Sequence, residues 1–182
     1  MSWPLLLALA SVSPEPEAPP PRQATTVRAA GDAAVGWLEG LPLWLGGVGL
    51  EIGSQRGPVA IAVGPHYARG ELDPGLAMQT LHLRGAVEWA LGERFRIGIG
   101  GRTGFTWIQR ATNDRWMNGM SLGAAPQLSF DLIRLPEGDS LFLRASPAAD
   151  LFLEGGDDEG DAAMTLPSLE LTLGYRWDET PE

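Results

Sequence analysis

Between residues 83 and 107 the chain reads LRGAVEWALGERFRIGIGGRTGFTW, and its apolar side chains keep alternate positions on both sides of a Gly92-Glu93-Arg94 break. The positions between them hold arginine, glutamate or glycine. A period of two is the pattern of β-strands whose two faces have different surroundings, and the short break predicts a hairpin. The question is which of the two faces meets water.

The same alternation occurs in eight segments of strand length between residues 25 and 177, without a convincing amphipathic helix. Tight turns with glycine or proline join some of them, at 54–57, 92–94 and 136–138. Longer polar links are expected at 68–78, 109–118 and 154–164, while the link at 38–43 is short. Short turns at one end and longer loops at the other are typical of an outer-membrane barrel.

Composition narrows the class of protein further. The 182 residues suit one domain, and no apolar run approaches the ~20 residues of a transmembrane helix. All 13 basic residues are arginine, and the net charge of -10 argues against nucleic acid as a partner. The absence of cysteine excludes disulfides and zinc-thiolate sites, and we predict no cofactor and no metal site.

Charged residues lie between the apolar positions of the strands, six acids against six bases. Because burying an unpaired charge costs several kcal/mol, this balance favours a closed lumen with a structural charge network over a solvated sheet surface. The network is expected to comprise Arg28, Asp32, Glu51, Arg84, Glu88, Arg96, Arg102, Asp131, Arg144, Asp150, Glu170 and Arg176. Its strongest cluster is predicted toward the short-turn side, at Glu51, Glu88, Arg96, Asp131, Arg144 and Arg176.

Aromatic residues gather toward both ends of the apolar face, as in the girdles of a lipid-facing wall. The expected girdle residues are Trp37, Trp44, Tyr67 and Trp107 toward the long loops, and Trp89, Phe95, Phe130, Tyr175 and Trp177 toward the short turns.

The last segment, residues 169–177, reads LELTLGYRW and resembles the C-terminal insertion signal of bacterial outer-membrane proteins. It departs from that signal in the five residues that follow the terminal aromatic. The layout of residues 25–177 is similar to the small eight-stranded barrels of the OmpA-domain and OmpX-like class. The resemblance implies an all-β fold, an eight-stranded antiparallel up-and-down transmembrane β-barrel, in the outer membrane of a Gram-negative bacterium. It also implies contact of residues 169–177 with the barrel insertion machinery.

The remaining segments are short. Residues 1–13 resemble a weak signal peptide without its basic n-region, residues 14–24 form a proline-rich linker, and residues 178–182 form a short tail. A soluble lipocalin-like barrel or sandwich, with the apolar face inside, is the alternative architecture.

Several motifs suggest chemistry, and each has a simpler explanation. Gly119-Met-Ser121-Leu-Gly123 matches a nucleophile elbow, but no helix follows and both histidines precede the serine. His66 and His82 are expected to join the lumen hydrogen-bond network rather than a metal site or pH switch. The glycines at 98–104 suit a crowded barrel interior better than a dinucleotide loop. The acidic segment at 154–161 lacks the EF-hand register, and Trp116 is a candidate contact to lipid headgroups or a partner.

We therefore expect no enzymatic activity, with a lipid-modifying barrel enzyme as a minor alternative. The predicted role is structural or surface-interacting, through extracellular loops that contact outer-membrane lipid, including lipopolysaccharide. A small-molecule-binding or narrow channel barrel, and a soluble carrier with the faces reversed, are the alternatives. At eight strands the interior is just wide enough to be filled by side chains, which argues against an open pore.

Overall fold

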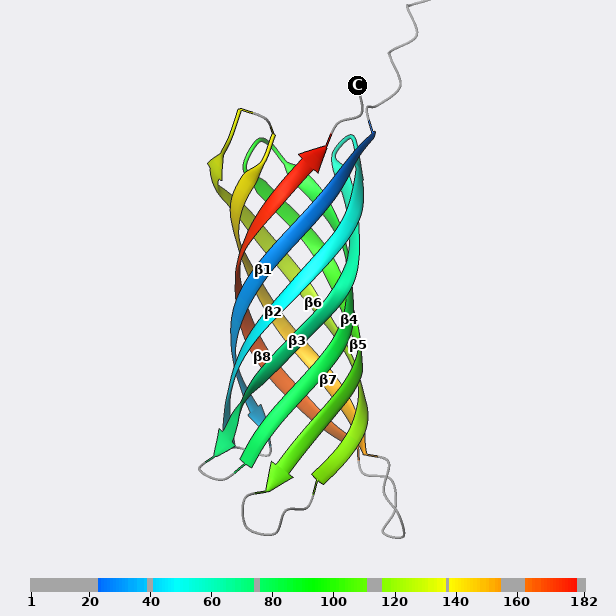
Figure 1. The fold of residues 1–182 in the computed structure, drawn as a ribbon, viewed down its shortest axis with the longest axis vertical. Helices are drawn as coiled ribbons and strands as arrows, with labels where there is room; N and C mark the ends of the chain where they lie inside the picture. Colours follow the sequence, from blue (N-terminus) through cyan, green and yellow to red (C-terminus); the bar gives the residue numbers. More distant parts are fainter. Residues whose placement is uncertain are drawn as a thin grey trace, which may run out of the picture.

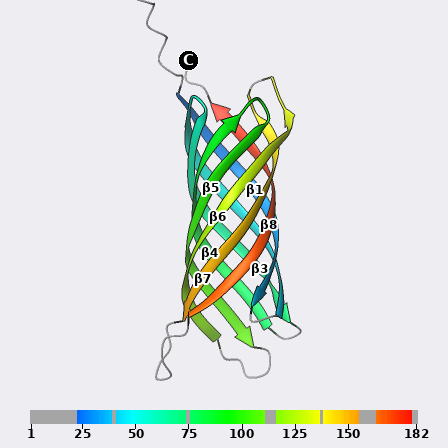
Figure 2. The same ribbon diagram turned by 180° about the vertical axis from the view of Figure 1, so that it is seen from behind.

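The computed structural model describes residues 23–38, 41–73, 76–110, 116–136, 138–154 and 163–179, and these residues form a closed antiparallel barrel (Figures 1 and 2). Each strand pairs with its neighbours in chain order, and β1 also pairs with β8. The strands are β1 (Gln23–Leu38), β2 (Leu41–Arg56), β3 (Val59–Asp73), β4 (Leu76–Leu91), β5 (Phe95–Arg110), β6 (Trp116–Arg134), β7 (Ser140–Glu154) and β8 (Ala163–Glu179). No helix long and apolar enough to cross a membrane occurs among these residues. The predicted eight-stranded all-β class is confirmed.

The barrel closes with an offset between its first and last strands. Partners traced from Gln23 through β2 to β8 lead to Leu171, and Leu171 pairs with Ala33 on β1. The path thus returns to β1 ten residues from its start. An offset of this size in eight strands requires a tilt of about 35–45° to the barrel axis, and the tilt is visible in Figure 1. Residues at one height in the lumen therefore come from different points along each strand.

The two ends of the barrel differ in their connections. The turn end carries both barrel termini and the links at 57–58, 92–94 and 135–139, and the loop end carries the links at 39–40, 74–75, 111–115 and 155–162 (Figure 1). The expected long link at 68–78 is wrong, because β3 continues to Asp73 and β4 begins at Leu76. Arg69 and Gln79 pair with each other across this extension. These polar residues therefore belong to the loop-end part of the barrel wall rather than to a loop. Only the loop-end link at 155–162 is longer than every turn-end link.

The apolar face of every strand points outward. Many of the large apolar side chains at these positions are 40–63% exposed, among them Ile99, Val48 and Leu122 near the middle of the wall. A surface this apolar over the whole circumference is incompatible with water, because soluble monomers rarely expose apolar patches above a few hundred Å². The faces-reversed carrier would have required these side chains inside. The exterior and the fold together place the protein in the outer membrane, as predicted.

Most of the predicted girdle residues lie near strand ends. Trp37, Trp44 and Trp107 are near the loop end, whereas Tyr67 lies closer to the middle of its strand. At the turn end, the rings of Phe95 and Phe130 are 4.8 Å apart, and those of Tyr175 and Trp177 are 4.7 Å apart.

The distance between the two aromatic levels fits a membrane. Trp177 pairs with Val27, and Trp37 follows Val27 by ten residues on β1. Ten residues of strand span about 33 Å, which the tilt reduces to about 25 Å along the barrel axis. This height matches the apolar band of about 25 Å in outer-membrane barrels.

A charge on the outer wall should destabilise the barrel according to its depth. We expect Ile99→Arg, in the middle of the wall, to lower the free energy of unfolding by about 2–4 kcal/mol, and Leu91→Arg, at the turn end, by about 0–1 kcal/mol. Both side chains are more than half exposed, so a water-facing wall would tolerate both substitutions equally. Urea titration in lipid vesicles measures the difference, and equal small losses would contradict a lipid-facing wall.

Candidate functional site

The inward face of the barrel carries the predicted charge network, which the structure divides into clusters stacked along the axis. Strand β7 crosses all of them, since its inward side chains run from Arg144 near the turn end to Asp150 and Phe152 near the loop end. All twelve predicted residues point into the barrel, and most are buried.

The central cluster consists of Arg28, Glu51, Glu88 and Arg144, from four different strands. Arg28 donates to Glu88 at 2.8 Å and to Glu51 at 3.4 Å. Arg144 lies 3.3 Å from Glu51 and 3.1 Å from Glu88. Each arginine thus bridges both glutamates, so that the four charges alternate and cancel. The Arg144 guanidinium also lies 5.3 Å from the ring of Phe142.

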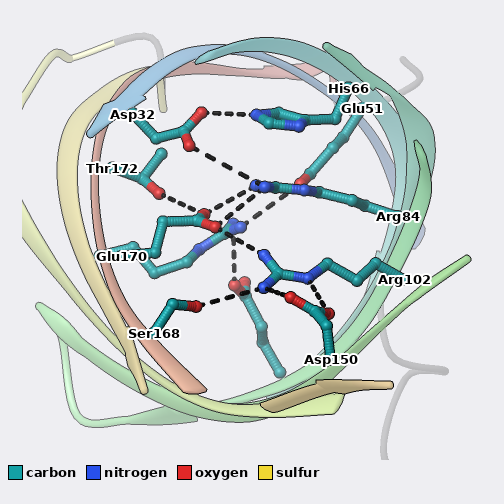
Figure 3. Close-up of polar contacts among 11 residues, drawn as sticks. Asp32, Glu51, His66, Arg84, Arg102, Asp150, Ser168, Glu170 and Thr172 are labelled. Carbon is teal, nitrogen blue, oxygen red and sulfur yellow. Dashed lines mark hydrogen bonds and ion pairs between the residues drawn. The ribbon is translucent and has the colours of Figure 1, made fainter. Parts of the chain in front are cut away.

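The loop-side cluster consists of Asp32, His66, Arg84, Arg102, Asp150 and Glu170 (Figure 3). Arg84 donates to both oxygens of Glu170, at 2.7 and 2.9 Å, in the fork geometry that makes arginine–carboxylate pairs strong. Arg102 joins Glu170 at 3.0 Å and holds both oxygens of Asp150. His66 Nε2 lies 2.6 Å from Asp32 Oδ1.

Three predicted residues lie outside these two clusters, namely Asp131, Arg176 and Arg96. Asp131 pairs with Arg176 at 2.9 Å and with Arg134 at 3.0 Å, forming a separate turn-end cluster. Arg96 donates to Gln55 at 3.1 Å and has no carboxylate within ion-pair distance among the described residues. The six residues expected in one cluster therefore fall into two groups, with Arg96 separate from both. No ion pair among the described residues joins the two groups.

Inward glycines make room for these long side chains. A Cβ on Gly123 would collide with the Asp150 carboxylate, and a Cβ on Gly47 would lie 2.6 Å from His66 Nε2 and 2.8 Å from Asp32 Oδ1. The glycines of β5 at positions 98, 100 and 104 likewise point inward, against Glu88, Gln127 and His82. Their role is to leave space in the lumen, as the sequence indicated.

His82 and Ser121 lie against each other between the loop-side cluster and the loop end. His82 Nε2 is 2.6 Å from Ser121 Oγ, and Ser121 Oγ is 3.1 Å from Thr106 Oγ1. Both side chains are buried, and His82 Nδ1 has no hydrogen-bond partner among the described residues. Nucleophilic catalysis by serine needs a third group to orient the histidine and access for a substrate. His82, Ser121 and Thr106 form a hydrogen-bonded group in the wall of a small cavity.

The loop end of the lumen holds an apolar cluster that the sequence analysis missed. Five buried side chains from five strands meet there, namely Leu43, Met78, Ile108, Phe152 and Leu166. The inward face was expected to be polar or small throughout. The available signal was the loss of alternation near the loop end, as in Trp107-Ile108 and Leu151-Phe152-Leu153. Consecutive apolar residues in a barrel strand indicate that the interior has also become apolar.

Other sequence predictions fall outside the described part of the chain. These are the signal peptide and most of the linker in residues 1–22, the acidic segment at 155–162, the side chain of Trp116 and the end of the tail at 180–182. Within the described ranges, no group of three or more His, Asp or Glu side chains is placed to hold a metal ion.

A closed eight-stranded barrel with an apolar exterior and buried charged side chains inside defines a small outer-membrane β-barrel. No protein-family model matches the chain, and no curated protein matches it in sequence. Among solved structures, it is similar to Neisserial surface protein A, with 14% identity, a TM-score of 0.54, and coverage of 84% of this chain and 95% of that one. The outer membrane enzyme PagL matches at 15% identity and a TM-score of 0.48, covering 79% and 97%. The attachment invasion locus protein Ail of Yersinia pestis matches at 10% identity and 0.43, covering 87% and 99%.

Proposed function

We propose that this protein is a membrane-anchored surface protein, in which the barrel holds the loop-end segments at the cell surface and carries no solute. The filled interior is the observation that supports this role. The cavities that border the charged clusters measure about 30, 20 and 10 Å³. Small-molecule sites usually occupy about 300–1,000 Å³, so these spaces suit one or two water molecules rather than a ligand.

The ion pairs oppose a transport role for a second reason. Side chains that bridge the lumen, such as Arg84 from β4 to Glu170 on β8, would have to separate before a solute could pass. Separating buried partners leaves uncompensated charges and costs several kcal/mol. The charge network therefore stabilises the barrel as an anchor. Specific contacts are made by the loop-end surface, and lipopolysaccharide is the proposed partner.

Shortening a loop tests this role without disturbing the wall. In one variant, two residues replace 155–162, so that this link matches the length of the links at 39–40 and 74–75. We expect the variant to keep heat-modifiable gel mobility but to lose co-migration with purified lipopolysaccharide in detergent. Liposomes that contain the unchanged protein should take up no sugar in a swelling assay. Lipopolysaccharide binding that survives the shortening of both 111–115 and 155–162 would contradict the proposed role of the loops, and sugar uptake would favour the channel alternative.

A lipid-modifying enzyme is the less favoured function. The 2.6 Å contact between His82 and Ser121 is the observation in its favour. Against it, Ser121 lies inside the barrel beneath the apolar cluster, away from lipid.

A further inference from the structure

The apolar cluster brings together buried side chains of five strands at the loop end of the lumen. We call Leu43, Met78, Ile108, Phe152 and Leu166 the apolar cap; all five are 3% exposed or less. The partly buried Leu45, Leu76 and Met164 pack against it. Phe152 lies directly over Gly119 of β6, where a Cβ would lie 2.6 Å from the ring. The cap thus places closely packed apolar side chains at this end of the lumen.

On the turn side of the cap, the lumen is charged rather than apolar. The side chains of Glu51, Arg84 and Arg102 keep 14–16% exposure although they lie inside the barrel. The cavity of about 30 Å³ lies directly under the cap, between Leu43, Met78 and Leu166 on one side and the loop-side cluster on the other. A cavity of this size and polarity holds water when two or more polar groups face it.

Polar atoms without protein partners border the same spaces. Arg84 Nε, Gln127 Oε1, Arg144 Nε and Ser146 Oγ have no hydrogen-bond partner among the described residues, and all four side chains line the cavity of about 20 Å³. Buried polar groups of this kind are normally satisfied by ordered water. The charged part of the lumen is thus suited to hydration, and the cap is not.

We propose that the apolar cap is the permeability barrier of the barrel: it separates a hydrated, charged lumen from the cell exterior and so prevents leakage of protons and small ions. Hydrophobic constrictions close channels by excluding water, because an ion or proton has no solvation there. The charged clusters do not supply this barrier by themselves, since carboxylates, guanidiniums and water form a hydrogen-bonded path. This inference rests on the proposed anchor function: the cap makes the barrel impermeable to protons and small ions, which its ion pairs alone do not.

Two phenylalanines on one strand provide a matched test. Phe152 and Phe142 both lie on β7, both point inward, and both are 2% exposed or less. Each packs over a glycine of a neighbouring strand, Gly119 and Gly174 respectively. Phe152 belongs to the cap, whereas Phe142 contacts Arg144 within the charged region. Serine is the suitable replacement, because an apolar cavity left by alanine can stay dry.

The experiment measures the decay of an imposed pH gradient in liposomes that carry a pH-sensitive dye and each protein, after heat-modifiable mobility has confirmed folding. We expect the unchanged protein, Phe142→Ser and Phe152→Leu to hold the gradient, and Phe152→Ser to dissipate it severalfold faster. If Phe152→Ser does not fold, Ile108→Ser takes its place with the same expectation. Folded Phe152→Ser or Ile108→Ser that is as tight as the unchanged protein would overturn the proposal but not the anchor role. Equal leakage from Phe142→Ser and Phe152→Ser would show that the barrier lies outside the cap. Leakage from the unchanged protein would overturn the cap as a barrier. The anchor role is tested separately, by the sugar-uptake assay described above.

Discussion

Replacing Arg144 with alanine is expected to lower the free energy of unfolding by about 3–5 kcal/mol, the usual cost of breaking a buried ion pair from one side. Arg144 is 5% exposed and neutralises both Glu51 and Glu88. Without it, Arg28 alone faces two carboxylates, the partly buried Glu51 and the buried Glu88. The measurement is urea unfolding in lipid vesicles, followed by tryptophan fluorescence.

Two other arginines serve as controls for this prediction. Arg134 pairs with Asp131 but its side chain is 42% exposed, so Arg134→Ala should cost less than about 1 kcal/mol. Arg96 is buried but bonded to Gln55 rather than to a carboxylate, so Arg96→Ala should cost about 1–3 kcal/mol. Adding Glu51→Gln to Arg144→Ala should restore part of the loss, since one uncompensated charge disappears. A loss no greater than that of Arg134→Ala, or no recovery in the double variant, would show that the central cluster is not coupled.

The strands and the direction of their faces could be predicted from the sequence because alternation is local. A residue's place in the period decides whether it points inward, which is why Arg28, Glu88 and Arg144 could all be assigned to the lumen. The partners could not be predicted. Arg28 and Glu88 are 60 residues apart and Arg84 and Glu170 are 86 apart. Their meeting depends on the ten-residue offset of the barrel, which sets the height of each residue and has no local signal.

Because the offset of the barrel has no local signal, the strongest cluster was predicted to include Arg96 and to exclude Arg28. Arg96 lies on the inward face near the turn end, as expected, but the tilt of β5 brings it to Gln55 instead of to Glu51. The apolar cap was missed for a different reason. Its members lie near strand ends, where Met78 fell within the link expected at 68–78 and Gln109, next to Ile108, within the link expected at 109–118.

Gly64 gives the second large expected effect. A Cβ at this position would collide with the carbonyl oxygen of Leu50 and lie 2.8 Å from the Cα of Glu51. These are backbone atoms of β2, so no side-chain movement relieves the collision. The ladder between β2 and β3 is already interrupted here, since pairing passes from Val63 directly to His66. Gly64→Ala should therefore push β2 away from β3 and cost about 3 kcal/mol, the upper range for overpacking.

The neighbouring Gly85 provides the matched control. Gly85 pairs with Val63 on the other side of β3, and a Cβ there would meet only the carbonyl oxygen of Ala62 at 3.8 Å. Gly85→Ala should leave stability unchanged or raise it by about 0.5–1 kcal/mol, because alanine loses less conformational freedom on folding than glycine. The folded fraction of each variant, measured by heat-modifiable mobility across a urea series, separates the two. Equal stability of Gly64→Ala and Gly85→Ala would mean that β2 can move at no cost. Since Glu51 moves with β2, Arg144→Ala should cost less in a Gly64→Ala background than in the unchanged protein, because the Arg144–Glu51 contact is already broken and only the Arg144–Glu88 contact remains to be lost.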